Sequence, residues 1–149
     1  MRIDHRPTQP VACVHQTAPT VLVDQIGRAI GEVIHHLNEA GVAPVGPPYA
    51  RTTWEPGTDL EIGVPVSVVV SGGGRVVAGE LPGGTMAATT HLGPHDTIAA
   101  TAAKLRRWIA QQGFAENGTP WEVYVTNPRE VPDPNQWEHE LVYPVRKRQ

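Results

Sequence analysis

The chain of 149 residues contains an internal repeat, and this repeat limits the folds that the chain can adopt. Residues 11–19 and 86–94 are both strand-like runs that end in a small residue followed by proline. A stretch with apolar residues at three- and four-residue spacing follows each run, which predicts one buried helix face in each half. Two further strands then end each half, at 48–56 and 60–66 and again at 120–128 and 140–145. The order β-α-β-β therefore occurs twice.

The two copies are expected to form a single domain of the α+β class. Neither copy alone can bury both a sheet face and a helix, so the two pseudo-symmetric β-α-β-β modules should form one antiparallel sheet with two long helices packed on it. The predicted domain covers residues 1–149, with repeat 1 at about 10–67, a link at 68–83 and repeat 2 at about 84–146. The three glycines at 72–74 predict a hairpin turn in the link.

Individual residues indicate where the helices end and how they pack. Asp96 is predicted to cap the start of the second helix, and Gly41 the end of the first. Gly27 and Gly31 lie inside the first helix, where they reduce helix propensity, and we expect them to permit close packing. Residues 146–149 are expected to be a frayed, solvated end.

Composition and charge exclude several classes of protein. The chain is long enough to bury a core, and its single cysteine, Cys13, rules out a disulfide-bonded scaffold. The charged, proline-containing N-terminus is unlike a signal peptide, and no stretch approaches the roughly 18 apolar residues of a membrane span, which predicts a cytoplasmic protein without a membrane partner. A net charge of -3 gives no electrostatic reason to bind nucleic acid directly.

Several clusters of polar residues fit a structural role better than a catalytic or metal-binding one. The glycines at 72–74 are not followed by Gly-Lys-Ser/Thr, so a phosphate-binding loop is disfavoured. The histidine pairs at 91 and 95 and at 35 and 36 do not match the spacing of a metal site. Cys13 and His15 share a strand face, but a single small cysteine on a strand is most often a packing residue. We therefore expect no metal and no cofactor.

The run Trp121-Glu122-Val123-Tyr124 is the strongest candidate for a binding site. Side-chain alternation places Glu122 and Tyr124 on one sheet face and Trp121 on the other. In one interpretation Glu122 is solvated and paired with an arginine. In the other it lies at the floor of a cleft between the two repeats, where a carboxylate and aromatic walls attract a flat apolar cation. The residues predicted to line this cleft are Glu122, Tyr124, Trp54, Tyr49, Trp137, His91 and Trp121.

Several segments together resemble the GyrI-like family of small-molecule-binding domains, over nearly the whole chain. They are Gly-Glu-Leu-Pro-Gly-Gly-Thr-Met-Ala at 79–87, His-Leu-Gly-Pro at 91–94, Trp-Glu-Val-Tyr-Val-Thr-Asn-Pro at 121–128 and Tyr-Pro-Val at 143–145. This family shares its domain with the effector-binding halves of multidrug-sensing regulators of the AraC and MerR types. The resemblance implies paired β-α-β-β modules and a cleft glutamate, here Glu122, that binds lipophilic cations.

Three functions follow from the residues and from this resemblance. The first is a stand-alone binding protein, without a helix-turn-helix segment, that captures bulky aromatic and often cationic compounds and confers resistance by sequestration. The alternative is a hydrolase that opens the cyclopropane of DNA-alkylating natural products, in which Glu122 directs a water molecule and Tyr124 assists by hydrogen bonding. A third, a protein that shields gyrase, is disfavoured because a net charge of -3 is too small to mimic DNA.

Overall fold

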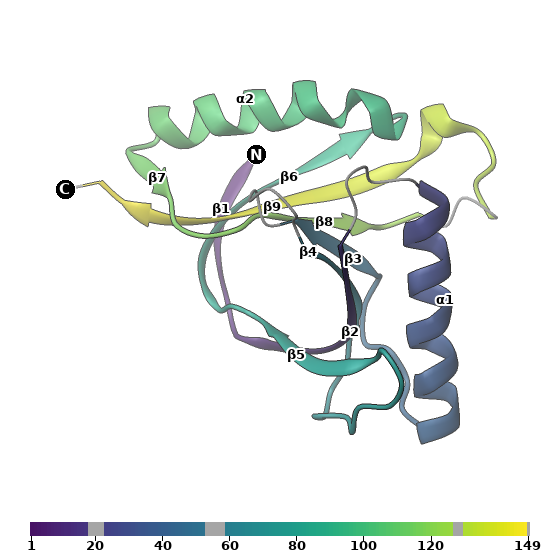
Figure 1. Cartoon of the computed structure of the whole chain (residues 1–149). Coiled ribbons are helices and arrows are strands. Elements are labelled where there is room, and N and C mark those ends of the chain that lie inside the picture. The colour runs from purple at the N-terminus through teal and green to yellow at the C-terminus, as the bar shows by residue number, and fades with distance from the viewer. Residues whose placement is uncertain (18–22, 53–58, 127–129, 149) are drawn as a thin grey trace. The chain divides into compact units, whose positions relative to one another are not determined.

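The computed structural model describes residues 1–17, 23–52, 59–126 and 130–148. The chain divides into two compact units, one of residues 7–83 and one of residues 1–6 together with 84–149. Each unit combines antiparallel strands with one long helix, which confirms the predicted α+β class (Figure 1). The link predicted at 68–83 is part of the first unit, whereas the N-terminal strand belongs to the second.

The described part of the unit of residues 7–83 contains four strands and one helix. These elements are β2 (Gln9–Thr17), α1 (Val23–Ala40), β3 (Tyr49–Thr52), β4 (Asp59–Pro65) and β5 (Val77–Leu81). The strands pair antiparallel in the order β3-β4-β2-β5. A bridge between Gly73 and Val76 precedes β5, and Gly74 has a φ of 59°, a left-handed conformation that glycine adopts without strain. This turn lies where the glycine run predicts one.

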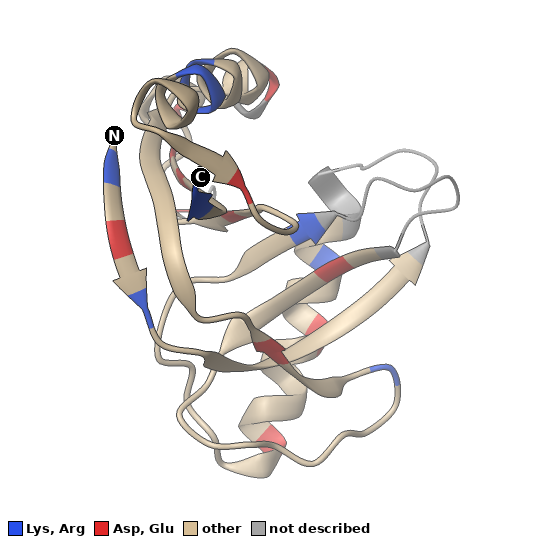
Figure 2. Ribbon diagram, turned by 90° about the vertical axis from the view of Figure 1, so that its left-hand side faces the viewer, with Lys and Arg blue, Asp and Glu red and all other residues tan. Residues whose placement is uncertain are grey.

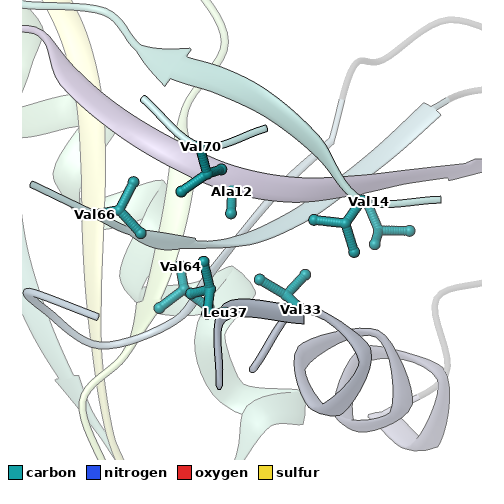
Figure 3. Packing of buried hydrophobic residues seen from close by; sticks show 8 residues of the cluster. Ala12, Val14, Val33, Leu37, Val64, Val66 and Val70 are labelled. Carbon is teal, nitrogen blue, oxygen red and sulfur yellow. The ribbon is translucent and has the colours of Figure 1, made fainter. Parts of the chain in front are cut away.

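The core of this unit forms between α1 and one face of the sheet. Val33 and Leu37 of α1 pack against side chains on one face of β2 and β4 and against valines that follow β4 in the chain (Figure 3). The cluster comprises Ala12, Val14, Val33, Leu37, Val64, Val66, Val70 and Val76. Gly27 and Gly31 are exposed, and a Cβ added at either would meet nothing within 4 Å, so the prediction that they permit close packing is wrong. Gly41 ends α1 with a φ of 71°, in agreement with its predicted capping role.

Among its described residues, the second unit contains five strands, one long helix and two short 3-10 helices. These elements are β1 (Arg2–Arg6), β6 (Gly84–Leu92), η1 (His95–Thr97), α2 (Ile98–Gln111), β7 (Phe114–Glu116), β8 (Trp121–Tyr124), η2 (Pro134–Gln136) and β9 (Glu138–Lys147). The main strands pair antiparallel in the order β1-β6-β9-β8, and β7 pairs with the far end of β9. This order is equivalent to β5-β2-β4-β3 of the first unit.

Helix α2 covers the sheet face that carries Ala87, Leu141 and Tyr143, against which it buries its apolar residues. The prediction that Asp96 caps this helix is wrong, because Thr97 occupies the N-cap position after the η1 turn and makes no side-chain capping bond. The predicted frayed end is also wrong in part. Residues 146 and 147 continue β9 through pairing with β7, which holds them in the sheet.

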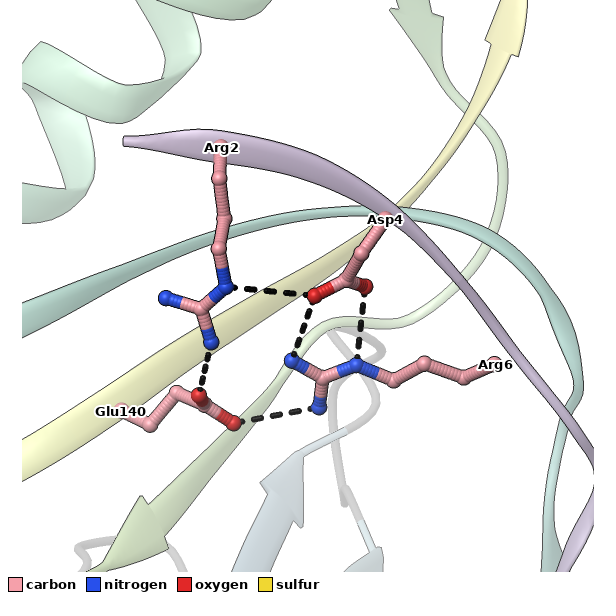
Figure 4. A network of polar contacts seen from close by, with 4 residues as sticks. All are labelled: Arg2, Asp4, Arg6 and Glu140. Carbon is pink, nitrogen blue, oxygen red and sulfur yellow. Dashed lines mark hydrogen bonds and ion pairs between the residues drawn. The ribbon is translucent and has the colours of Figure 1, made fainter.

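The opposite face of this sheet carries a network of ion pairs that fastens the edge strand β1. Arg2, Asp4 and Arg6 alternate along β1 (Figure 2), and both arginines reach across β6 to Glu140 of β9 (Figure 4). The shortest contact, from Arg2 Nη2 to Glu140 Oε2, is 2.6 Å long. Ala88 on β6 is the direct partner of Arg2, and both Ala88 and its own partner on β9, Val142, are fully buried. Long charged side chains therefore cover an apolar surface at this edge.

None of the described helices has both the length and the apolar character needed to cross a membrane.

Candidate functional site

Strand β8 places Glu122 and Tyr124 on one face of its sheet, with the alternation that the sequence predicts. In the pairing of β8 with β9, Glu122 lies opposite Leu141 and Tyr124 opposite His139. Leu141 packs against α2, so Glu122 and Tyr124 lie on the helix-covered face of the sheet, and both are partly buried. Trp121 lies on the other face and is 5% exposed, so its ring is not beside the Glu122 carboxylate.

Three rings cross this face in register, one from each of β8, β9 and β6. The Tyr124 ring meets the His139 ring edge-on, with 5.4 Å between the ring centroids. The centroids of the His139 and His91 rings are 6.1 Å apart. His139 was not among the predicted site residues. The signal that could have identified it is the run Glu138-His139-Glu140, a polar start to an otherwise apolar strand.

His91 connects this row of rings to the start of α2. Its Nδ1 lies 2.6 Å from Thr101 Oγ1, and its Nε2 lies 2.9 Å from Thr97 Oγ1 and 3.2 Å from the Pro94 carbonyl oxygen. Both ring nitrogens are thus engaged within the unit. His91 itself is buried, with 6% of its surface exposed.

The surroundings of Tyr124 determine its ionisation. Burial, followed by the negative charge of Glu122, raises the pKa of the Tyr124 hydroxyl well above its ordinary value of 10.0. The phenol therefore stays protonated far above neutral pH, and a hydrogen bond with Glu122 adds to the rise in its pKa. A partly buried carboxylate beside an aromatic ring and a hydroxyl donor is an arrangement suited to a ligand that is both flat and positively charged.

Of the two tryptophans predicted to form the walls of the cleft, Trp137 lies among the described residues and Trp54 does not. Trp137 is partly buried just before β9, where its indole Nε1 donates a 2.6 Å hydrogen bond to the Val131 carbonyl oxygen. Its own carbonyl oxygen accepts a 2.8 Å bond from the Gly93 amide, which fixes it beside the end of β6. Trp137 therefore lies at the same end of the sheet as Tyr124 and His139. Trp54 lies outside the described residues.

Tyr49 belongs to the other unit and is almost fully buried there. Its hydroxyl donates a 2.6 Å hydrogen bond to Oε2 of Glu61, and burial followed by the charge of Glu61 raises the pKa of this hydroxyl above its ordinary range. Glu61 was not singled out in the sequence, although Leu60-Glu61-Ile62 shows the same alternation as the run around Glu122. The Tyr49 hydroxyl is thus already engaged within its own unit.

Comparison with known proteins identifies the fold and the family. The sequence matches the GyrI-like small molecule binding domain over residues 1–146. A comparison with curated proteins found no match. The EcmrR C-terminal domain has a similar structure, with a TM-score of 0.82 and 21% identity over 98% of this chain and 96% of that one. In the EcmrR-DNA complex the TM-score is 0.81 at the same identity, and the chain spans 57% of the EcmrR chain.

Two further solved structures share the fold at lower identity. A hydrolase encoded by lin2189 from Listeria innocua gives a TM-score of 0.70 at 13% identity, covering 97% of this chain and 91% of that one. SAV2435, bound to tetraphenylphosphonium, gives a TM-score of 0.62 at 10% identity, and the match covers 97% of this chain and 93% of the SAV2435 chain. The match over almost the whole chain, together with this fold, means that the chain belongs to the family of GyrI-like small-molecule-binding domains.

Proposed function

We propose that the protein binds bulky aromatic cations and that Glu122 supplies the negative charge that selects them. The observation that carries this proposal is the position of Glu122 on β8, partly buried and on the same face as the rings of Tyr124 and His139. Sequestration of such compounds is the function that this chemistry would serve.

Removing a carboxylate from water costs free energy, and a nearby positive charge offsets part of this cost. A lipophilic cation can approach a partly buried carboxylate at a smaller desolvation cost than a hydrated metal ion, and the attraction between the two charges is stronger there than in bulk water. Aromatic faces add a cation–π attraction of about 0.5–2 kcal/mol for each ring in contact. Carboxylate and rings thus favour the same ligand, and the structure of SAV2435 with tetraphenylphosphonium supports this ligand class for the fold.

The proposal can be tested by comparing a cation with a neutral molecule of similar shape. The full chain is titrated with tetraphenylphosphonium and, separately, with triphenylphosphine oxide, and binding is followed by calorimetry or tryptophan fluorescence. We expect saturable binding of the cation that is at least about tenfold tighter than that of the neutral compound, a difference of about 1.4 kcal/mol. Equal affinity for both compounds would show that charge does not select the ligand.

Hydrolysis of a reactive cyclopropane is the second candidate function, favoured by the adjacency of Glu122 and the protonated Tyr124 hydroxyl. In this reaction Glu122 would take a proton from water while the water oxygen attacks a ring carbon. The ring C–C bond breaks, and its electron pair is received by the conjugated carbonyl, which Tyr124 would stabilise by donating a hydrogen bond. Incubation with a cyclopropane-bearing alkylator, followed by chromatography and mass spectrometry, distinguishes the two functions. Catalytic turnover supports hydrolysis, whereas stoichiometric binding without product supports capture.

A further inference from the structure

A second cluster of reactive side chains lies in the unit of residues 7–83, on the sheet face opposite α1. Cys13 and His15 are both on β2, and His15 is paired directly with Glu61 on β4. The Cys13 sulfur lies 3.7 Å from His15 Nε2, and that nitrogen lies 3.8 Å from Glu61 Oε1. All three ligand atoms are within 4.8 Å of one another. A thiol, an imidazole and a carboxylate therefore converge on one point.

Two glycines on the neighbouring strands leave room for this cluster. Gly63 on β4 is paired with Cys13, and a Cβ at this position would lie 2.8 Å from the Cys13 Cβ and 2.9 Å from the Tyr49 hydroxyl. Gly79 on β5 lies on the other side, where a Cβ would come within 2.9 Å of the Cys13 sulfur. Any larger residue at either position would displace the thiol or the phenol, so the space around the sulfur depends on both glycines.

We propose that Cys13, His15 and Glu61 form a binding site for a divalent transition metal ion, with zinc as the best match. Thiolate, imidazole and carboxylate are the three protein ligands that zinc uses, at bond lengths of about 2.0–2.3 Å. In a tetrahedral complex with these bond lengths, neighbouring ligand atoms lie roughly 3.3–3.6 Å apart. The observed separations of 3.7 and 3.8 Å are close enough that small side-chain movements would complete the site.

The surroundings of the three ligands favour this use. Tyr49 donates its hydrogen bond to Oε2 of Glu61, which holds the carboxylate with Oε1 toward His15, as an outer-shell partner of a metal ligand does. The His15 side chain is 45% exposed and provides a route from solvent. Three protein ligands leave the fourth position of a tetrahedral ion to water or to another ligand.

Two features oppose binding and make the proposal more specific. Burial, and then the charge of Glu61, raises the pKa of the Cys13 thiol to about 11. The thiol is therefore protonated at neutral pH, and a metal ion must displace this proton to bind the sulfur. Arg51 is paired directly with Glu61 in the β3–β4 register, so its positive charge lies on this face of the sheet and repels an approaching metal ion. Arg51→Gln is therefore expected to strengthen metal binding.

The test is a titration of the full, phosphine-reduced chain with cobalt(II) chloride, followed by absorption spectroscopy and by competition with zinc chloride. We expect one ion per chain, a near-ultraviolet thiolate-to-cobalt band and the visible bands of a tetrahedral complex, all lost when zinc is added. Cys13→Ala should abolish the thiolate band, and His15→Gln should weaken binding by at least about tenfold. His15 is partly exposed, so its replacement tests the site even where the buried Cys13 variant is unstable.

His35→Gln is the matched control, because His35 forms an exposed pair with Glu39 on α1 at 3.2 Å but has no thiol beside it. This variant should bind cobalt as the parent does. The proposal is overturned if the parent chain shows no thiolate band at one equivalent of cobalt, or if His15→Gln binds as tightly as the parent. Tetraphenylphosphonium binding does not depend on this outcome, since Glu122 belongs to the other unit.

Discussion

The ring of Tyr124 meets the ring of His139 edge-on, with 5.4 Å between their centroids and 78° between their planes. Since the two residues are direct partners in the β8–β9 pairing, this contact fixes Tyr124 on the face that also carries Glu122. His139 is held in turn beside His91, whose ring nitrogens contact Thr101 and Thr97 near the start of α2. The positions of Tyr124 and His139 therefore depend on packing within their own unit.

Shortening the Tyr124 side chain should lower stability because it removes this ring contact. Tyr124→Leu is expected to cost about 2–4 kcal/mol of unfolding free energy, whereas Tyr124→Phe keeps the ring, loses only the hydrogen bond of the hydroxyl with Glu122, and should cost about 1–2 kcal/mol. Urea denaturation of the two variants measures the difference. Equal losses would indicate that the contact with His139 contributes nothing to stability.

Two glycine-to-alanine substitutions should change stability in opposite directions. A Cβ at Gly63 would lie 2.6 Å from the Ala12 carbonyl oxygen, so Gly63→Ala is expected to destabilise by about 1–3 kcal/mol or more. Gly27 lies exposed in α1 with nothing near its Cβ position, so Gly27→Ala should stabilise by about 0.5–1 kcal/mol. Thermal melts of the two variants should move in opposite directions, and a stable Gly63 variant would contradict the described packing around Cys13.

Removal of the Tyr49 hydroxyl should leave Glu61 short of a donor in a nearly buried position. Tyr49→Phe is expected to lower the unfolding free energy by about 1.5–3 kcal/mol, the usual range for a hydrogen bond to a charged group. In the Glu61→Gln background the same change should cost less, because the acceptor there is uncharged. Denaturant unfolding of the two single variants and the double variant measures this coupling, and strict additivity would argue against the bond.

The ion pairs on β1 should contribute to stability in a way that depends on pH. The hydrogen bond from Arg6 is the main cause that lowers the pKa of Asp4 below its ordinary value of 3.8. A carboxyl whose pKa is lower in the folded state stabilises the fold above its unfolded pKa, and this contribution is lost as the pH falls through the folded pKa. Asp4→Asn should thus cost up to about 1 kcal/mol at neutral pH and nothing in strong acid.

Unfolding midpoints measured at neutral pH and over a series of acid pH values below the ordinary pKa of 3.8 check this prediction. Asp96→Asn, which removes an exposed carboxylate from the η1 turn, serves as the control for a general loss of negative charge. A constant difference between Asp4→Asn and the parent chain at all of these pH values would contradict the assigned role of the Arg6 contact.

Sequence periodicity predicted the two helices and most of the strands because each has an apolar face. Strand β1 was missed, since Arg2, Asp4 and Arg6 alternate as charges and the strand has no apolar stripe. Its stability comes from pairing with β6 and from contacts with Glu140, more than a hundred residues away in sequence. Such an edge strand cannot be recognised without its partners.

The residues of the two candidate sites could also be predicted only in part from the sequence. Alternation alone placed Glu122 with Tyr124, and Cys13 with His15, because members of each pair lie on one strand. The third partners, His139 and Glu61, come from neighbouring strands and depend on register, which the sequence does not define to within one residue. The sequence predicts a packing role for Cys13 because it does not show that Glu61 lies beside His15 on the neighbouring strand.

The affinity of Glu122→Gln for tetraphenylphosphonium decides whether the charge of Glu122 selects the ligand. Glutamine keeps the size and shape of the side chain but removes its charge, so the variant should fold normally and bind the cation about tenfold more weakly. Its affinity for the neutral triphenylphosphine oxide should not change. Glu140→Gln, on the opposite face of the same sheet, is the matched control and should bind the cation as the parent does. An unchanged affinity of a folded Glu122→Gln variant for the cation would contradict the assignment of Glu122 to the site.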